Sequence, residues 1–473
     1  MRYRALWALA PAVLLAACDL APAYHPPVVA VPAKFKEAGD WRPAAPRDDY
    51  GLWWRSFGDP TLNALEPQVE IANQDLAAAR AAYLQARDYV AEAQSALYPH
   101  VGSEADFSYN RQSNNRPLRG SGEPDYYGAN TVAGEASYEV DLWGRIKDDI
   151  AAHKAQAQAS LADLAAARLS LQAELARDYL GLRGLDREAK LLRDTVAAYR
   201  DALKLTQQRL SGKIGAPIDV ARAQVQLENA KARLADIAGP RALYEHAIAT
   251  LIGRPASNFS IPPTARSAAL PVIPHSVPST LLERRPDIAG AERETAAANE
   301  SIGIARSAFF PRFTINLLAG EQDTGINLLS LSNSFWSVGP TIYLPLFDAG
   351  KRQAQLAAAE AAYLQTVANY RATVLKAIQE VEDDLAVLKS LRLESIDVEA
   401  SAVSAQRASD LALTAYRDGA TSYLDVITAQ TAALDAQRTA LAVATRRLQT
   451  AAALILALGG DWSAEELAGL DRP

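Results

Sequence analysis

The apolar residues in the second half of the chain follow a regular spacing. They recur in steps of three and four at Tyr363, Val367, Tyr370, Val374, Ile378, Val381, Leu385 and Leu388. The steps average about 3.5 residues, which is the period of helices packed in coiled coils. Such a stripe is most simply the buried face of a helix, so it predicts packing and not a ligand site.

Two long stretches with almost no helix-breaking residues extend this prediction. Residues 351–418 contain neither Gly nor Pro, and residues 145–211 contain only Gly181 and Gly184. A helix of that length is on the order of 100 Å long at about 1.5 Å per residue. A short break follows each stretch, near Gly212 to Pro217 and near Gly419, and then a second long helix. The pattern predicts two antiparallel hairpins of long helices, and alanine, about a fifth of the chain, lets the helices approach closely.

Four shorter segments alternate between apolar and polar residues instead. They are residues 100–111, 131–143, 312–321 and 335–347, and each has the length and period of a transmembrane β-strand. The spans 98–143 and 309–347 hold 14 of the 34 aromatic residues, as expected for girdles at two membrane–water boundaries. Soluble hairpins are the alternative. Four strands cannot close a barrel, so spanning strands would require an oligomer.

The chain also repeats itself at a spacing of 206 to 212 residues. Leu97-Tyr98-Pro99 recurs as Phe309-Phe310-Pro311, Asp141-Leu142-Trp143-Gly144 loosely as residues 346–350, Ile218-Asp219-Val220 as Leu424-Asp425-Val426, and Leu251-Ile252-Gly253 as Ala457-Leu458-Gly459. Four matches in one order indicate a tandem duplication. Each copy begins with a helix, at residues 62–97 and 281–307, followed by two strands and the long hairpin.

The N-terminus has the features of an export signal. Arg2 and Arg4 precede a short apolar stretch that ends in Leu-Ala-Ala before Cys18, the only cysteine. This is also the bacterial lipobox pattern, so we expect residues 1–17 to be a signal peptide and Cys18 to carry acyl chains. An ordinary signal peptide with a chance cysteine is the alternative. Residues 18–50, rich in Pro and Ala, are expected to form an extended tether.

Composition argues against several other classes of protein. The net charge of −7 comes without a basic stripe, which is unlike a nucleic-acid binder. The five histidines are scattered, and no metal-binding spacing, nucleophile motif or phosphate loop is present. We therefore expect no enzyme activity, cofactor or metal. The acidic run Glu382-Asp383-Asp384 is best explained as a solvated helix face.

Several segments along nearly the whole chain resemble the outer membrane factors, the TolC-like channels of efflux pumps, and specifically their NodT-type lipoprotein branch. The matching segments are residues 18–26, residues 54–60 with Leu62 and Leu65, residues 73–76, residues 284–288 with Ala291 and Glu292, and the two Gly…Asp-Val turns. Arg284-Arg285-Pro286-Asp287 is the most specific of them. Its structural role is expected to be a helix N-terminus with Pro in the first turn.

The resemblance implies a mainly α fold with a small β part. Long antiparallel coiled-coil helices would form a helical barrel, and four transmembrane β-strands per protomer would give a 12-stranded barrel in a homotrimer. The implied function is an outer-membrane channel, anchored by lipid and extending into the periplasm, that exports drugs or other small molecules. Its implied partners are a periplasmic adaptor (membrane fusion protein), an inner-membrane pump of the RND type, and outer-membrane lipid. Type I secretion, metal efflux and a lipid-anchored periplasmic coiled-coil adaptor remain alternatives.

The resemblance also implies a gate at the periplasmic tips. The candidate gate residues are Asp219, Tyr416, Arg417, Asp418 and Asp425, and the candidate adaptor-contact tips are Gly212, Gly215 and Gly419. An arginine found in some family members would fall at Thr421, so the charges nearby are expected to substitute for it. For Asp219 a helix N-cap is the structural alternative.

The expected domain organisation follows from these observations. Residues 1–17 are the signal peptide, 18–50 the tether, 51–260 the first repeat, 261–280 a linker, 281–460 the second repeat and 461–473 a C-terminal tail.

Overall fold

A computed structural model describes residues 20–38, 52–113, 115, 122, 124–272, 278–325, 327, 330–460 and 462–471. Cys18 and the expected signal peptide lie outside the described residues. The described chain divides into two compact units. Unit 1 comprises residues up to 28 with 82–160 and 291–370, and unit 2 comprises 29–81, 161–290 and 371 onward.

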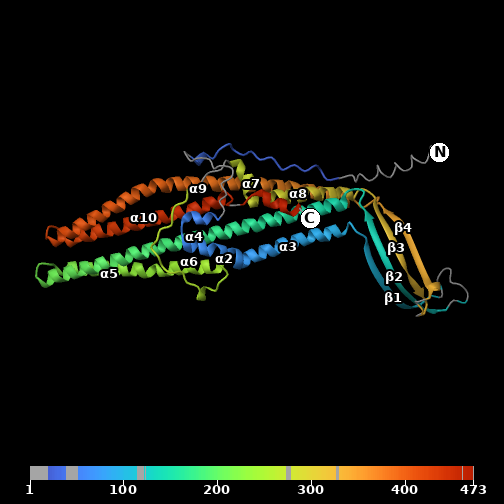
Figure 1. The fold of residues 1–473 in the computed structure, drawn as a ribbon, viewed down its shortest axis with the longest axis horizontal. Coiled ribbons are helices and arrows are strands. Elements are labelled where there is room, and N and C mark those ends of the chain that lie inside the picture. The colour runs from blue at the N-terminus through green and yellow to red at the C-terminus, as the bar shows by residue number, and fades with distance from the viewer. Residues whose placement is uncertain are drawn as a thin grey trace. The chain divides into compact units, whose positions relative to one another are not determined.

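Both copies of the repeat contain the expected order of elements (Figure 1). The first runs α2 (Pro60–Ala72), α3 (Gln74–Ser95), β1 (His100–Arg111), β2 (Tyr126–Val140), α4 (Arg145–Ser211), α5 (Pro217–Asp236) and α6 (Ala238–Leu251). The second runs α7 (Leu281–Arg284), α8 (Pro286–Ser307), β3 (Arg312–Asp323), β4 (Ser334–Tyr343), α9 (Lys351–Arg417) and α10 (Tyr423–Ala457). The mainly helical fold with a small β part is confirmed.

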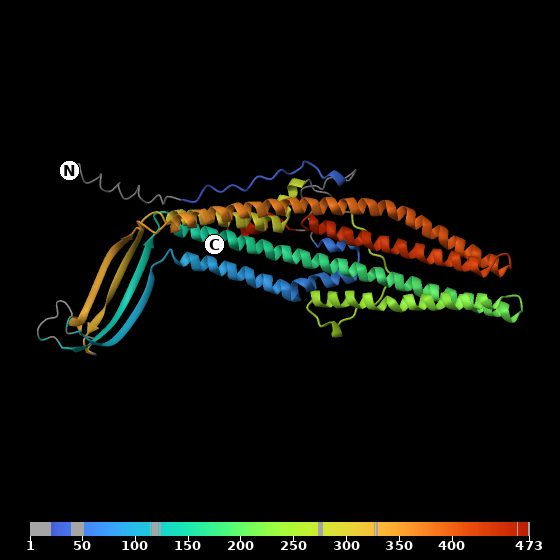
Figure 2. The same ribbon diagram turned by 180° about the vertical axis from the view of Figure 1, so that it is seen from behind.

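The two longest helices occupy the segments without helix breakers. α4 and α9 each have 67 residues, and each forms a hairpin with the helix that follows it (Figure 2). Along α9 the predicted stripe is largely buried at Val367, Tyr370, Val374, Val381, Leu385 and Leu388, whereas Tyr363 and Ile378 are half-buried.

Three breaks interrupt the expected helices, and two of them, at Asn73 and Ile237, were not predicted. The helix expected over 62–97 divides at Asn73, whose side chain accepts from Leu76 N at 2.9 Å and donates to Leu251 O at 2.9 Å. The helix expected over 281–307 divides at Arg285, and α8 begins at Pro286, where the Arg284-Arg285-Pro286-Asp287 motif predicted a helix N-terminus. α5 and α6 meet at Ile237, just before Gly239-Pro240. Because Pro240 has no N–H, the helical ladder cannot continue through it.

The strands form one antiparallel sheet in the order β1-β2-β3-β4, all within unit 1 (Figure 1). β1 begins and ends at the predicted residues. β2 starts five residues earlier than expected and β4 ends four residues earlier, because pairing with a neighbour and not the local alternation sets the end of a strand.

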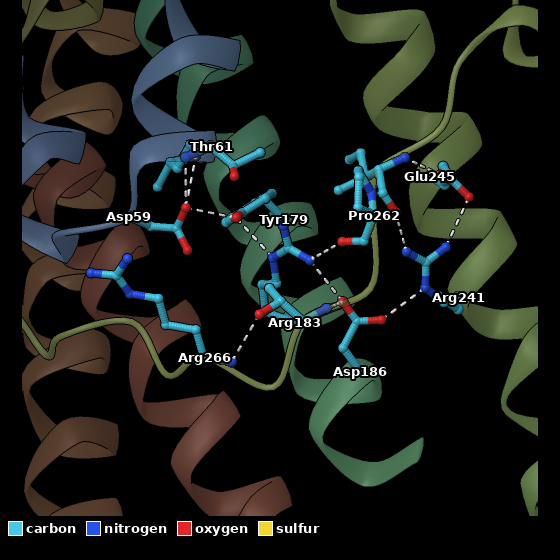
Figure 3. A network of polar contacts seen from close by, with 12 residues as sticks. Asp59, Thr61, Tyr179, Arg183, Asp186, Arg241, Glu245, Pro262 and Arg266 are labelled. Carbon is cyan, nitrogen blue, oxygen red and sulfur yellow. Dashed lines mark hydrogen bonds and ion pairs between the residues drawn. The ribbon is translucent and has the colours of Figure 1, made fainter. Parts of the chain in front are cut away.

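A buried polar network joins helices of unit 2 (Figure 3). Arg183 Nη1 donates to Asp186 Oδ2 at 2.8 Å, and Arg241 Nε donates to Asp186 Oδ1 at 2.8 Å. Tyr179 Oη donates to Asp59 Oδ1 at 2.7 Å, and the same oxygen accepts from Thr61 N and so caps α2. The network holds α2, α4, α6 and the loop at Pro262 together, because Asp186 pairs with both arginines and Arg183 Nη1 also donates to Pro262 O at 2.9 Å.

Among the described helices, α10 alone is long and apolar enough to cross a membrane by length and composition. Core helices of soluble proteins pass the same test. α10 contributes Tyr423 and Val426 to a buried cluster with Tyr199 of α4 and Leu227 of α5, so its apolar face packs on other helices.

Candidate functional site

The four-stranded sheet has one apolar and one polar face. Across the sheet, Val101 lies opposite Ala136, Ala136 opposite Leu317, and Leu317 opposite Val338. Residues at the same register share a face, and the next residue along a strand points to the other. The apolar face therefore also carries Phe107, Val132, Ile315, Trp336 and Ile342.

The opposite face carries mainly hydroxyl, amide and carboxylate groups. They include Glu104, Asp106, Thr131, Glu135, Ser137, Asn316, Ser337 and Thr341, and the apolar exceptions include Ala129, Ala133, Leu318 and Phe335. Ser137 Oγ donates to Asn316 Oδ1 at 3.2 Å, and Asn316 Nδ2 donates to Thr341 Oγ1 at 3.0 Å, so three strands are linked side chain to side chain. Because its side chains are mainly hydrogen-bonding groups, this face is suited to contact with water.

The apolar face is uncovered in the single chain. Val101 and Trp336 are each 74% exposed, and Phe107 is 63% exposed. Tyr109 and Tyr126 stack at 6.2 Å between ring centroids at the end of the sheet beside the β1–β2 loop. This face is mainly apolar, with Ser103, Asn130 and Glu321 among the exceptions, and a surface of this kind bordered by aromatic rings requires a non-aqueous neighbour.

Two of the duplicated motifs, those containing Trp143 and Phe310, meet at the end of the sheet where β2 leads into α4 and β3 begins. We call this end the base of the sheet. Trp143 Nε1 donates to Pro311 O at 2.8 Å, and the Trp143 and Phe310 rings stack at 4.7 Å. Arg145 at the start of α4 forms a two-pronged ion pair with Glu139 of β2, at 2.9 and 3.0 Å. These contacts hold both repeats at one point of unit 1.

The predicted tip turns lie in unit 2, at 212–216 and 418–422. Gly215 is required by close approach, since a Cβ there would lie 2.9 Å from Leu210 N. Gly419 is required by its φ of +80°, which L-residues rarely adopt. Gly212 has ordinary space around it, and the left-handed residue of its turn is Lys213.

Tyr416 is brought together with a second tyrosine that the sequence analysis did not identify. The Tyr416 and Tyr423 rings lie 5.1 Å apart and are 4% and 1% exposed. Burial, and to a lesser degree the nearby Asp219 carboxylate, raises the pKa of Tyr416. Both phenols are therefore neutral and pack within the apolar cluster between the hairpins.

Arg209 is the second residue that the sequence analysis missed. From the last turn of α4, its Nη1 donates to Tyr416 O at 2.9 Å and to Arg417 O at 3.1 Å, at the end of α9. Its guanidinium also lies 4.7 Å from the centre of the Tyr416 ring. A basic residue in the last turn of a helix was the available signal, but such residues usually interact with the end of their own helix.

The acidic gate candidates differ in their surroundings. Asp219 lies in the first turn of α5, 4.0 Å from Arg222, and Ala216 and not Asp219 occupies the N-cap position. Asp425 forms a capping box with Ser422 at the start of α10. Donation from the Thr421 and Ser422 side chains lowers the pKa of Asp425. The side chains of Arg417 and Asp418 are exposed and have no partner within the part of the chain that the structure describes.

No group of three or more His, Cys, Asp or Glu side chains within the described ranges is arranged to hold a metal ion.

Comparison with known proteins is consistent with this geometry. The sequence model of a family described as outer membrane efflux protein matches residues 66–254 and 277–460. Outer membrane protein OprJ of Pseudomonas aeruginosa is 32% identical, over 96% of this chain and 95% of its own. Cation efflux system protein CusC of Escherichia coli is 28% identical, over 95% and 97%. The solved structure of the outer-membrane channel OprN superposes with a TM-score of 0.86 at 28% identity, over 94% of this chain and 99% of that one.

Proposed function

Because the chain belongs to the outer membrane efflux protein family, we propose that three copies of it assemble into a single channel. The protein is an outer-membrane efflux channel of a tripartite pump system. The main observation in support of a trimer is the structure of the sheet. It has one face compatible with lipid and one compatible with water, and its edge strands β1 and β4 each have one unpaired side.

The strand count favours three copies. Lipid does not tolerate open sheet edges, so β1 and β4 must pair with other chains. Two copies would give eight strands, a barrel whose interior is about filled by its own side chains. Three copies give twelve strands, the smallest multiple that leaves a wider lumen, with the polar face turned inward.

Exposed apolar residues on the helices of unit 2 support contacts between copies. Ile396, Val403 and Leu411 of α9 are 61%, 72% and 62% exposed, and Val225 of α5 and Leu243 of α6 are 60% and 69% exposed. Large apolar side chains at this exposure are expected to lie against a neighbouring chain. In a trimer, α9 of one copy would cover α5 and α6 of the next.

The tip turns are proposed to close the periplasmic end. Asp219, Asp425, Arg417 and Asp418 would be repeated three times around the axis, where rings of charge can constrict a pore. Gly212, Gly215 and Gly419 are proposed to mark the tips that meet the periplasmic adaptor. Bilayer conductance of Asp219→Ala and Asp425→Ala tests the gate, and unchanged conductance in both would contradict it.

The transported compounds are proposed to be drugs or other small molecules, delivered by an inner-membrane pump of the RND type through the adaptor. Energy would come from the pump, and the channel itself would carry out no chemical step. The similarity to CusC keeps metal-ion efflux as a second candidate. Residues 1–17 are proposed to be removed and Cys18 to be acylated.

Extraction and mass measurement test the assembly. We expect the protein to require detergent, to migrate differently when heated, and to have three times the chain mass by native mass spectrometry. A water-soluble monomer after removal of the acyl chains would instead support a periplasmic scaffold.

A further inference from the structure

Residues 20–24 contact α8 within unit 1. Leu20 O accepts from Arg306 Nη1 at 3.3 Å, and Pro22 O accepts from Asn299 Nδ2 at 2.8 Å. Tyr24 Oη donates to Glu292 Oε1 at 2.5 Å, with a second contact to Glu292 O at 3.1 Å. The segment therefore runs antiparallel to α8, with its first residues at the C-terminal end of that helix.

The contacts on α8 come from one stripe of residues. Glu292, Ala296, Asn299, Gly303 and Arg306 follow each other in steps of four, three, four and three. Residues at this spacing share a face of a helix. We call these five residues the α8 stripe.

The Tyr24 side chain occupies one end of the stripe. Its ring packs against the buried cluster of Ala155, Ala296 and Ala297, and the Arg293 guanidinium lies 6.0 Å from the ring centre. Burial and the hydrogen bond to Glu292 raise the pKa of Tyr24, so the phenol keeps the proton that it donates. A phenol donating to a half-buried carboxylate is a strong, directional contact.

Gly303 provides the space at the other end. A Cβ there would lie 2.8 Å from both N and Cβ of Ala21, and also against the Asp148 carboxylate. Only glycine permits the backbone of the segment to approach α8 this closely.

A second, separate contact holds the next part of the segment in unit 2. Phe35 is 3% exposed, and Glu382 accepts from Lys36 N at 2.6 Å and Glu37 N at 3.0 Å. Glu382 thus binds the start of a short 3-10 helix, η1 (Lys36–Ala38), and is not simply a solvated acid.

We infer that the α8 stripe is a docking groove for the mature N-terminal segment Leu20–Tyr24, and that this docking sets where the lipid anchor meets the membrane. Its partner is a segment of the same chain. Two residues of chain reach at most about 7 Å, so acyl chains on Cys18 stay close to Leu20. Leu20 is bound by Arg306, six residues before β3 begins at Arg312. The anchor therefore enters beside the base of the sheet, a consequence that rests on the proposed acylation.

Site-specific photo-crosslinking in the full-length, membrane-inserted protein tests the docking. A benzophenone amino acid replaces Tyr24, or Val28, which is 85% exposed, as the matched control. We expect the probe at 24 to react with the peptide 292–306 and the probe at 28 to react at least fivefold less with it. Crosslinks from position 24 only to other segments or proteins would overturn the docking, whatever the transport activity is.

Insertions test whether docking or tether length places the anchor. Six Gly/Ser residues after Asp19 separate the anchor from the dock, whereas the same insertion after Asp49 only lengthens the later chain. We expect the first to lower the fraction of heat-modifiable trimer in the outer membrane severalfold and the second to leave it unchanged, with acyl labelling of Cys18 retained in both. Equal effects of both insertions, or no effect of either, would mean that docking on α8 does not place the anchor and that the N-terminal segment acts as a free tether. Loss of acyl labelling in the unmodified chain would instead contradict the proposed acylation.

Removal of the phenol hydroxyl gives a milder variant. In Tyr24→Phe the hydrogen bond from the segment to Glu292 is lost, while Arg293 still donates to that carboxylate, and we expect about tenfold faster proteolysis within residues 20–38. Val28→Ala should cleave at the unmodified rate, and unchanged cleavage of Tyr24→Phe would contradict the role of Tyr24.

Discussion

Arg209 joins the ends of two long helices at the tip of unit 2. It binds the last carbonyls of α9 and stacks on Tyr416, so it links the α4–α5 hairpin to the α9–α10 hairpin within one chain. A gate that opens by separating the hairpins must break this link. The guanidinium is therefore a candidate positioning residue beside the carboxylates predicted from the sequence.

Arg209→Ala is expected to favour the open channel. Hydrogen bonds from a charged group contribute about 1.5–3 kcal/mol, so the open population should rise roughly tenfold or more. Single-channel recording measures this, with Arg200→Ala, an exposed arginine of the same helix, as control. Equal open probabilities for Arg209→Ala and the unmodified channel would contradict the link.

Glu66 of α2 is fully buried, and neither carboxylate oxygen has a hydrogen-bond partner within the described part of the chain. Burial raises the pKa of Glu66 to about 9. Because the folded state retains a proton that the unfolded chain releases near its ordinary value, stability falls as pH rises from about 4.5 to 9.

Glu66→Gln is expected to remove this pH dependence. At pH 8 the variant should be more stable by on the order of 5 kcal/mol, and near pH 4 the two should be alike. Thermal unfolding at both pH values measures the difference. Glu70→Gln, an exposed site one turn away, should change neither, and an equal gain at both pH values would contradict the ionisation argument.

Among the elements, α4 and α6 depend on the buried Asp186. Asp186→Asn would leave the buried Arg183 without its counter-charge and Arg241 with Glu245 alone, at a cost of about 3–5 kcal/mol. The matched change Asp194→Asn removes a surface pair with Lys190 and should cost under about 1 kcal/mol. Denaturant unfolding compares them, and similar losses would mean that the network does not hold the helices together.

The two faces of β4 provide a test with adjacent residues. Val338 lies on the apolar face and Ser337 on the polar one. Lysine on a lipid-facing strand costs about 2–4 kcal/mol at mid-membrane. We expect Val338→Lys to reduce membrane insertion strongly and Ser337→Lys to be tolerated. Quantitative outer-membrane fractionation measures both, and the reverse ranking would mean that the faces are assigned the wrong way round.

Much of this element structure follows from local sequence. The first residues of α4, α9, β1 and β3 were predicted because glycine, proline and alternation mark them. The start of α8 at Pro286 also follows from the local sequence, since Pro286 and Asp287 predicted a helix N-terminus there. The break at Asn73 was missed because its cause is distant: Asn73 binds Leu251 O. The residues of the candidate site show the same difference between local and distant causes. Tip glycines follow from turn chemistry, whereas Arg209 acts on a helix end more than 200 residues away.

At the scale of the whole molecule, the duplication accounts for both units. Each repeat contributes two strands to the sheet and one long hairpin to the helical part. One chain therefore has surfaces that still lack a packing or hydrogen-bonding partner: an uncovered apolar face of the sheet, two strand edges and exposed apolar residues on α9. Three copies would satisfy all of them together.

Covalent linkage of neighbouring sheet edges tests this assembly most directly. One cysteine replaces Ala105 of β1, and a second is moved residue by residue along β4 from Phe335 to Ile342. An acylated Cys18 leaves no other thiol in the chain. After oxidation in the outer membrane, we expect one register to give a ladder of linked chains that stops at three. Ladders that continue beyond three, products that stop at two, or no linkage at any register would contradict a three-chain, 12-stranded channel.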